Sequence, residues 1–194
     1  DSFYYETYNR ENVSLINVKQ TPISRIEGHA VVVDSEIYEI DDLVLATGFD
    51  AMTGAARDID IRNENGNSLA ESWVAGPQTY LGLMVSEFPN MYLITGPQSP
   101  GVKSQMILSI EHHVDLIAEL IDKMRTDGSR KVVPAAPAQD AWVSENNKVA
   151  HMTLYPAAAS WYMGANIPGK PRVFMPYVAG VKQYRQTCAE IIED

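Results

Sequence analysis

Apolar residues in the first third of the chain gather in short runs separated by turn-forming residues. These runs cover residues 13–18, 30–34 and 42–47, and they are rich in residue types that favour β-strands. Four consecutive positions of the third run are apolar, which is typical of a strand covered on both faces of a sheet. The run leads into Gly48, where the chain can turn sharply or approach a ligand closely. Ligands of open α/β sheets bind at this end of a central strand.

The next part of the chain contains a second run of the same kind. Residues 49–78 are rich in glycine, asparagine, aspartate and threonine, and they predict an excursion with little regular structure. Residues 91–95 then predict another buried strand, which stops at Gly96 and Pro97.

A helical spacing of apolar residues follows at residues 104–125. The apolar side chains recur every three or four positions, at Ile107, Ile110, Val114, Ile117, Ile121 and Met124. This spacing predicts an amphipathic helix. Ser104 is a candidate cap at its start, and Gly128 lies just beyond its end.

The remaining third alternates irregular and regular segments. Pro134 and Pro137 indicate a linker, and a second helix is predicted close behind it. The expected order is a linker at 132–138, a helix at 138–154, an irregular segment at 155–170, a short strand at 172–177, a turn at 179–180 and a final helix. Strands and helices together predict an α/β fold.

The composition excludes several classes of function. The chain has 194 residues, with 15 basic and 25 acidic side chains and a formal net charge of −10. This balance argues against binding to nucleic acid or to anionic membrane surfaces. No apolar run approaches the roughly 20 residues of a membrane span. A single cysteine, Cys188, permits no internal disulfide or structural zinc site and fits a reducing, cytoplasmic compartment.

Two features of the chain concern its completeness. It begins with Asp1 and carries no signal-like leader, so we expect an interior fragment or a processed product. No two of its glycines are separated by a single residue, so neither G-x-G-x-x-G nor a P-loop is present. A dinucleotide-binding fold needs such a loop, because only glycine lets the backbone approach the pyrophosphate. If the parent protein binds dinucleotides, these loops are expected upstream.

Short motifs along the whole chain resemble one enzyme family. They occupy residues 42–50 (DLVLATGFD), 58–62, 76–82, 88–90, 96–100, 109–111, 153–156, 160–162, 164–170 and 184–186. In this order they resemble flavin-dependent Baeyer–Villiger monooxygenases, most closely the phenylacetone and cyclohexanone monooxygenase group. The family's fingerprint F-x-G-x-x-x-H-x-x-x-W-P, its glycine-rich loops and its catalytic arginine are absent from this sequence.

The resemblance implies the C-terminal part of a flavoprotein with two Rossmann-like domains, which bind FAD and NADP, and a helical and loop lid. Residues 1–48 would end the NADP-binding domain, residues 49–130 would belong to the FAD-binding domain, and residues 131–194 would form the C-terminal helix and lid. The implied reaction uses NADPH and O2 to convert a ketone to an ester or lactone. The implied partner is the N-terminal part of the same enzyme.

The resemblance also implies site residues. Trp161 corresponds to a tryptophan in a mobile loop that hydrogen-bonds to the nicotinamide nucleotide, although it could instead anchor an irregular segment to the core. Further cofactor contacts are expected at Thr47, Gly48, Phe49, Gln98 and Met106. The expected substrate pocket comprises Val102, Lys103, Ser104, Gln105 and Met106. No catalytic residue is assigned, because the catalytic arginine is expected upstream.

Several of these residues allow a simpler interpretation. Ser104 could be only a helix cap, Met106 could pack in the core, and Lys103 could point to solvent. The adjacent His112 and His113 point in different directions on a helix, so they cannot chelate one metal ion, and we interpret them as surface residues. The other histidines lack partners at ligand spacing, so no metal is assigned.

Two rival functions remain open from the sequence. An N- or S-oxygenating flavin monooxygenase would share the A-T-G turn at residues 46–48 but should lack the segments around Trp161 and residues 164–170. The other rival is a non-catalytic fragment that binds a partner chain through exposed apolar surface.

Overall fold

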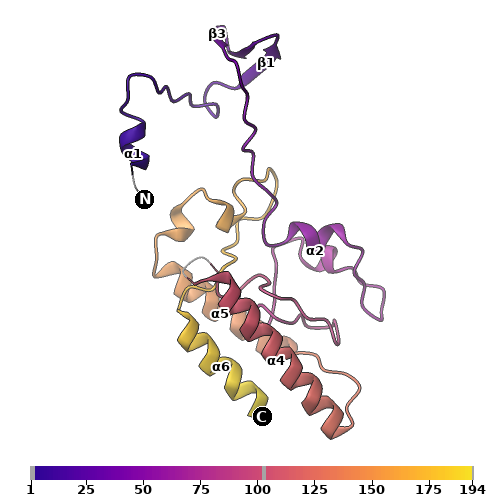
Figure 1. The fold of residues 1–194 in the computed structure, drawn as a ribbon. Helices are drawn as coiled ribbons and strands as arrows, with labels where there is room; N and C mark the ends of the chain where they lie inside the picture. Colours follow the sequence, from indigo (N-terminus) through magenta and orange to yellow (C-terminus); the bar gives the residue numbers. More distant parts are fainter. Residues whose placement is uncertain (1–2, 102–103, 194) are drawn as a thin grey trace. The chain divides into compact units, whose positions relative to one another are not determined.

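The chain divides into two compact units, Asp1–Thr47 and Gly48–Asp194, which are described separately. The computed structural model describes residues 3–101 and 104–193, without the side chains of residues 191–193. Figure 1 shows the elements of both units. The division lies next to the expected boundary at residue 48, but the expected NADP- and FAD-binding identities of the parts stay predictions.

The first unit contains a short helix and a three-stranded antiparallel sheet. The helix α1 covers Tyr4–Thr7, and the strands are β1 (Ile23–Glu27), β2 (Ala30–Val33) and β3 (Glu36–Glu39). They pair in the order β1-β2-β3, with β2 central. The strand predicted at residues 30–34 is therefore confirmed as β2. The strand predicted at residues 13–18 is wrong, because that segment forms no strand.

The apolar run at residues 42–47 also forms no strand, so this prediction is wrong for the described chain. Its side chains are exposed, and Val44 reaches 84% exposure. The reason is physical: a strand needs a neighbour for its backbone N–H and C=O groups and a layer to cover each face. No described segment of this chain supplies them to residues 42–47.

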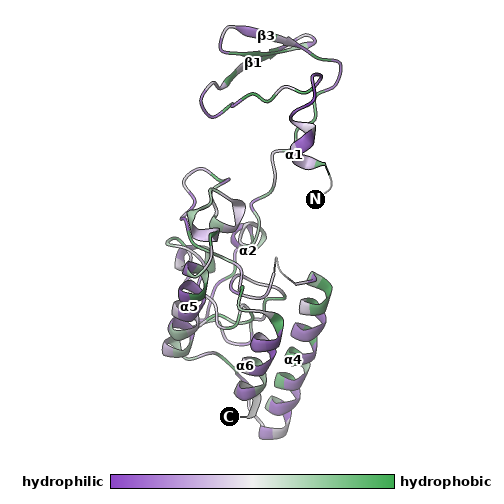
Figure 2. Cartoon of the chain, turned by 90° about the vertical axis from the view of Figure 1, so that its left-hand side faces the viewer, coloured by the Kyte–Doolittle hydropathy of each residue, from purple (hydrophilic) through white to green (hydrophobic). Residues whose placement is uncertain are grey.

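The second unit is built mainly from helices. They are α2 (Gly54–Asp58), α3 (Leu69–Ser72), α4 (Met106–Asp127), α5 (Ala136–His151), η1 (Tyr155–Ala157), η2 (Trp161–Met163) and α6 (Val181–Glu193). The helices α4 and α6 lie side by side (Figures 1 and 2). The predicted helix at 138–154 is thus confirmed as α5, and the predicted final helix is confirmed as α6. Pro137 lies in the first turn of α5, where a backbone N–H would have no partner within the helix, so proline is tolerated there. The helix therefore begins earlier, and the linker is shorter, than expected.

The long helix α4 confirms the predicted helix and its end, but not its cap. Gly128 takes the left-handed conformation at the C-cap (φ 70°). The N-cap residue is Gln105, which makes no side-chain capping bond. The Ser104 hydroxyl instead donates to the carbonyl of Gly101 at 3.0 Å, so the capping role predicted for Ser104 is wrong.

Only part of the predicted apolar stripe of α4 faces the core, where Ile117 packs. The buried side chains are Ser109, His113 and Leu116, whereas Val114 is 48% exposed. Other members of the predicted stripe, Ile107, Ile110 and Ile121, are exposed as well. The helix therefore has exposed apolar side chains that no described part of this unit covers. Figure 2 shows green, hydrophobic positions along the helix.

The main core of this unit joins α4, α5 and α6 to the loop that precedes Phe88. It contains Leu81, Leu83, Leu116, Trp142 and Tyr184, with further aromatic rings around them. Residues 91–95, predicted as a buried strand, run through this region without forming one, although the Leu93 amide donates to the Leu83 carbonyl at 2.7 Å. The strand predicted at 172–177 is likewise wrong, since only Tyr177 forms an isolated bridge, to Pro100.

Candidate functional site

Two of the segments that carry predicted site residues are joined through a third, residues 173–177. The amide of Gln98 donates to the carbonyl of Met175 at 2.5 Å, and the amide of Tyr177 donates to the carbonyl of Ser99 at 2.9 Å. On the other side, the amide of Met175 donates to the carbonyl of Tyr162 at 3.0 Å. The loop at Gln98 and the segment at Trp161 are therefore held in one arrangement by backbone hydrogen bonds, although more than 60 residues separate them in sequence.

The turn after residue 47 is held by the irregular segment that follows Trp161. The side-chain amide of Asn166 donates to the carbonyl of Phe49 at 3.0 Å. The ammonium of Lys170 pairs with the carboxylate of Asp50 and donates to the carbonyl of Ala51 at 3.1 Å. The predicted cofactor residues Gly48 and Phe49 thus lie next to this segment, with Gly48 in a left-handed conformation (φ 79°). Thr47 is the last residue of the first unit and is exposed.

Trp161 lies in η2 and is 42% exposed. The indole packs against the ring of Tyr162, with centroids 3.9 Å apart. Within the described part of the chain, the indole N–H has no hydrogen-bond acceptor, and the buried hydroxyl of the neighbouring Ser160 has no partner either. This corner of the unit therefore keeps a half-exposed aromatic surface together with unused hydrogen-bonding groups.

Gln98 uses its side chain to hold its own loop. The carbonyl oxygen of this side chain accepts a hydrogen bond from the Thr79 amide at 2.8 Å, and its NH2 group donates to the Pro77 carbonyl at 2.7 Å. The residue is buried and adopts a left-handed backbone (φ 66°), which costs energy for a residue with a Cβ. Its predicted cofactor contact stays a prediction, and the structure shows what the side chain contributes to the fold.

The predicted substrate pocket lies at the start of α4. Val102 and Lys103 lie outside the described residues. Ser104 is half-buried, with its hydroxyl bound to Gly101, whereas Gln105 and Met106 are exposed. The side chain of Met106 is 44% exposed, so the alternative of core packing within this unit is not what the structure shows.

His113 corrects the interpretation of the histidine pair as surface residues. It is fully buried, and its Nδ1 accepts a hydrogen bond from the Thr95 amide at 3.0 Å. Its Nε2 lies 2.7 Å from the hydroxyl of Tyr184, which itself donates to the carbonyl of Leu81 at 2.6 Å. Because the Tyr184 hydroxyl has one hydrogen, Nε2 must carry the proton that it donates to Tyr184. The hydrogen bonds therefore fix one neutral tautomer of His113.

Burial also shifts the acid–base properties of this core. It lowers the pKa of His113 to about 4, and the charge of the neighbouring His112 acts in the same direction. Burial raises the pKa of the Tyr184 hydroxyl, and it raises the pKa of the Cys188 thiol to about 12. Cys188 is therefore a protonated, unreactive thiol in the core.

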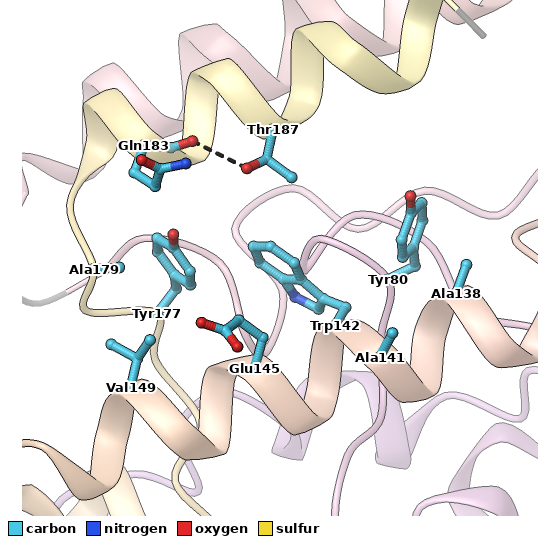
Figure 3. A pocket seen from close by; sticks show the side chains of 10 residues that line it. All are labelled: Tyr80, Ala138, Ala141, Trp142, Glu145, Val149, Tyr177, Ala179, Gln183 and Thr187. Atoms are coloured by element: carbon cyan, nitrogen blue, oxygen red, sulfur yellow. Dashed lines mark hydrogen bonds between the residues drawn. The ribbon is translucent and has the colours of Figure 1, made fainter.

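A cleft of about 500 Å3 lies between α5 and α6 and contains none of the predicted site residues. Figure 3 shows its walls, where the stacked rings of Trp142 and Tyr177 lie near the carboxylate of Glu145.

Among the described residues, no group of three or more histidine, cysteine, aspartate or glutamate side chains is placed to hold a metal ion. Within the same residues, no helix is both long and apolar enough to cross a membrane.

Comparison with known proteins identifies several proteins that are similar to this chain. No family model matches it. It is 41% identical over 192 residues to a Baeyer-Villiger monooxygenase of Pseudooceanicola batsensis, which covers 98% of this chain and 35% of that protein. Its structure resembles cyclohexanone monooxygenase from Rhodococcus sp. Phi1 bound to NADP+, with a TM-score of 0.89 and 35% identity over 100% of this chain and 36% of that one. A complex of OTEMO with FAD and NADP matches with a TM-score of 0.86 and 30% identity, over 100% of this chain and 35% of that one.

These matches show that the chain is similar, over nearly its whole length, to part of the flavin-dependent monooxygenases. Within that class, the likeness extends to a Baeyer-Villiger monooxygenase and a cyclohexanone monooxygenase, as the motifs had indicated. The fold class inferred from the resemblance is confirmed by the same matches. The chain spans about 35% of the length of these relatives.

From the sequence, Asn166 was expected to shape its loop and not to touch a ligand, and its bond to the Phe49 carbonyl agrees with that. The pairing of Lys170 with Asp50 and that of His113 with Tyr184 were missed. Asn166 and Lys170 belong to a motif that carried the resemblance, and this was the signal that could have singled them out. Nothing in the local sequence connects them to residues 49–51, because about 120 positions lie between Lys170 and Asp50.

Proposed function

We propose that this chain is part of an FAD- and NADPH-dependent monooxygenase that inserts one oxygen atom of O2 next to a ketone carbonyl and releases an ester or lactone. The observation that carries the proposal is the match to Baeyer–Villiger monooxygenases over the whole chain, including the segment of Trp161. The glycine-rich loops that grip the dinucleotides would come from the remainder of the enzyme, because this sequence has none.

The groups around Trp161 fit a nicotinamide dinucleotide. The indole offers an N–H donor and a rigid surface, and the preceding residue, Ser160, has a hydroxyl without a hydrogen-bond partner. On the neighbouring turn, Phe49 is 87% exposed and can cover an aromatic ring system. We assign Trp161, Thr47, Gly48, Phe49, Gln98 and Met106 to cofactor contacts. When bound, FAD supplies the electron-transfer and oxygen-transfer chemistry, and this chain contributes walls, donors and exclusion of water.

The start of α4 is assigned to the ketone. Residues 101–106 join the anchored loop at Gln98 to a rigid helix, so their side chains can vary without moving the loop before them. The N-terminus of α4 also presents unpaired backbone N–H groups, which favour partial negative charge nearby. We assign Val102, Lys103, Ser104, Gln105 and Met106 to the pocket that holds the ketone. The single buried thiol supports a reducing cytoplasmic location, which completes the proposal.

The test uses the full-length protein loaded with FAD. It is incubated with NADPH, 18O2 and a set of linear and cyclic ketones, and the products are identified by mass spectrometry. We expect esters or lactones that carry one 18O atom, with NADPH consumed in proportion. Oxidation of amines or sulfides without any ester would support the N- or S-oxygenating rival. A full-length protein that binds neither FAD nor NADPH would support the non-catalytic rival.

A further inference from the structure

We infer that Asn166 and Lys170 form a clasp that positions the segment carrying Trp161 against the turn of residues 48–51, and that NADP binding depends on this clasp. The inference rests on the proposed function for the role of Trp161. Asn166 and Lys170 are positioning residues in this scheme, because they act through Trp161 and the turn.

The Lys170 end of the clasp is an ion pair with a buried lysine and an aspartate, Asp50, whose side chain is 34% exposed. The Lys170 side chain is 4% exposed, and its ammonium pairs with Asp50 and also donates to the Ala51 carbonyl. A buried ammonium is stable only when charge and hydrogen bonds compensate for its lost hydration. By contrast, Lys148 and Glu145 form a pair on α5 whose side chains are 72% and 53% exposed. Such a solvated ion pair contributes little to the stability of the fold.

Two glycines leave room for this ion pair. A Cβ on Gly54 would lie 2.9 Å from the Cβ of Asp50, so only glycine lets the Asp50 side chain pack against the start of α2. A Cβ on Gly164 would lie 3.1 Å from the Cδ of Lys170 and 3.0 Å from the Pro171 carbonyl oxygen. The aliphatic part of Lys170 therefore packs directly on the backbone of the segment that it fixes.

The other end of the clasp is the side chain of Asn166, four residues before Lys170. It donates to the Phe49 carbonyl, on the residue next to Asp50. The two side chains thus bind three consecutive residues of the turn, 49–51. The three acceptors are the carbonyls of Phe49 and Ala51 and the carboxylate of Asp50, and the two side chains reach all three only when the segment lies in this position.

Short backbone hydrogen bonds connect the clasp to Trp161. The amide of Gly164 donates to the Trp161 carbonyl at 2.9 Å, and the amide of Ala165 donates to the Ser160 carbonyl at 3.1 Å. The amide of Lys170 donates to the Ile167 carbonyl at 3.2 Å. These successive turns leave little slack between residues 160 and 170, so release of Lys170 loosens the position of the indole.

The experiment compares variants of the full-length, FAD-loaded protein. Lys170→Met keeps the length of the side chain but removes its charge, Asp50→Asn removes the opposite charge, and a double variant carries both. Lys148→Met is the matched control, since it removes a lysine from the exposed pair on α5. NADP+ affinity is measured by titration of the flavin spectrum, and hydrogen exchange is followed in peptides that cover residues 155–170.

Lys170→Met is expected to weaken NADP+ binding by about 10- to 100-fold and to speed hydrogen exchange across residues 155–170, with FAD content unchanged. The double variant should bind NADP+ no more weakly than the weaker single variant, because both changes remove one interaction. Lys148→Met should match the parent in both measurements. If Lys170→Met fails to fold, Asn166→Ala at the exposed end should still weaken NADP+ binding by about 3- to 10-fold.

Faster exchange with parental NADP+ affinity in the Lys170→Met protein would overturn the inference, as would additive effects of the two single changes. Where Lys170→Met does not fold, parental affinity of Asn166→Ala would overturn it. Trp161→Ala separates this failure from failure of the proposed function. If Trp161→Ala weakens NADP+ binding while the clasp variants do not, the proposed role of Trp161 stands and the clasp is only structural.

Discussion

Single buried side chains decide much of the geometry in this chain, and His113 is the clearest case. It links the Thr95 amide on one side to the Tyr184 hydroxyl on the other, and so ties the loop before Gly96 to α6. Thr95 itself has a left-handed backbone (φ 54°), which is unfavourable for a β-branched residue. A hydrogen bond to a neutral imidazole therefore helps to hold a strained residue next to the proposed pocket loop.

The pKa of His113 predicts a pH dependence of stability. In the unfolded chain a histidine titrates near about 6.5, and in the fold the pKa falls to about 4 because of burial. The stabilisation that requires neutral His113 is therefore complete above about pH 6.5 and is lost as the pH falls through about 4. Its upper limit is on the order of 3 kcal/mol. NMR of the full-length protein with labelled histidine should show one imidazole that stays neutral at pH 5.5.

A substitution of His113 tests whether this residue causes the pH dependence of stability. His113→Ala removes the partners of the Thr95 amide and the Tyr184 hydroxyl and should lower the thermal midpoint at pH 7.5. It should also reduce the loss of stability between about pH 6.5 and 4, compared with the parent. An imidazole of His113 that titrates at its ordinary pKa would contradict the buried, neutral state.

Trp161 is the residue on which the proposed cofactor role depends. Trp161→Ala in the full-length enzyme should impair NADPH use and the coupling of NADPH oxidation to product, with little change in FAD content. One lost hydrogen bond costs on the order of 1 to 3 kcal/mol, and a looser cover admits water as well. Trp161→Phe is the control, because it keeps an aromatic surface without the N–H donor. Unchanged NADPH affinity and unchanged coupling in Trp161→Ala would remove this residue from the site.

At the scale of elements, local signals predicted the helices well and the strands poorly. The helix at α4 and its terminal Gly128 follow from spacing and backbone preference, which are properties of neighbouring residues. Residues 42–47 have the composition of a buried strand, yet Val44 is exposed in the described chain. Strand formation depends on a partner, and a sequence pattern cannot state whether this partner lies in the same chain.

The same limit applies to the two faces of α4. Apolar spacing predicted one stripe, but the face packed within this unit is marked by Ser109, His113 and Leu116. Two of these residues are polar, and both have hydrogen-bond partners in the buried region. The His113 ring accepts from the Thr95 amide, and the Ser109 hydroxyl lies within hydrogen-bond distance of the Ser104 hydroxyl. Val114 and other members of the predicted stripe are exposed in the described unit, so packing of this face stays a prediction.

The loop that leads into α4 gives a prediction about selectivity. We expect residues 101–106 to set the preference among ketones and to contribute little to cofactor affinity. A one-methylene change in an apolar pocket is worth roughly 1 to 3 kcal/mol, so Val102→Ala or Met106→Ala should shift relative rates among ketones by about 10- to 200-fold without abolishing turnover. Lys103→Leu tests whether the charge of Lys103 affects the preference among ketones. Rates with linear and cyclic ketones are compared while flavin content is measured.

Two results would contradict this assignment of the loop. If every variant keeps the parent's ranking of ketones, the loop does not contact the substrate. If flavin is lost before the selectivity changes, the loop is a structural connector between the segment at Gln98 and α4.

At the scale of the whole molecule, the candidate site comes from segments that are distant in sequence. The resemblance singled out Trp161 and Gln98, but not the route of hydrogen bonds through Met175 that connects their segments. It also gave no pairing for Asp50 and Lys170, because a long-range ion pair leaves no periodic trace in a sequence. Residue identities could thus be carried over from a family, whereas their mutual contacts required the fold.

The last prediction concerns the 194-residue chain by itself, which we expect not to fold autonomously. Leu43, Val44 and Leu45 expose an apolar segment, and the stripe of α4 with Ile107 and Val114 adds a second one. In a stable domain such surfaces are covered, because each buried Val, Leu or Ile side chain contributes about 1.5 to 3 kcal/mol. Expressed alone, the chain should aggregate or form a loosely packed state, as judged by light scattering, dye binding and near-UV circular dichroism. Co-expression with the remaining part of the enzyme as a separate chain is the control and should restore solubility. A monomeric isolated chain with a sharp, cooperative thermal transition would contradict the prediction, because its exposed apolar faces would then be compatible with a stable fold.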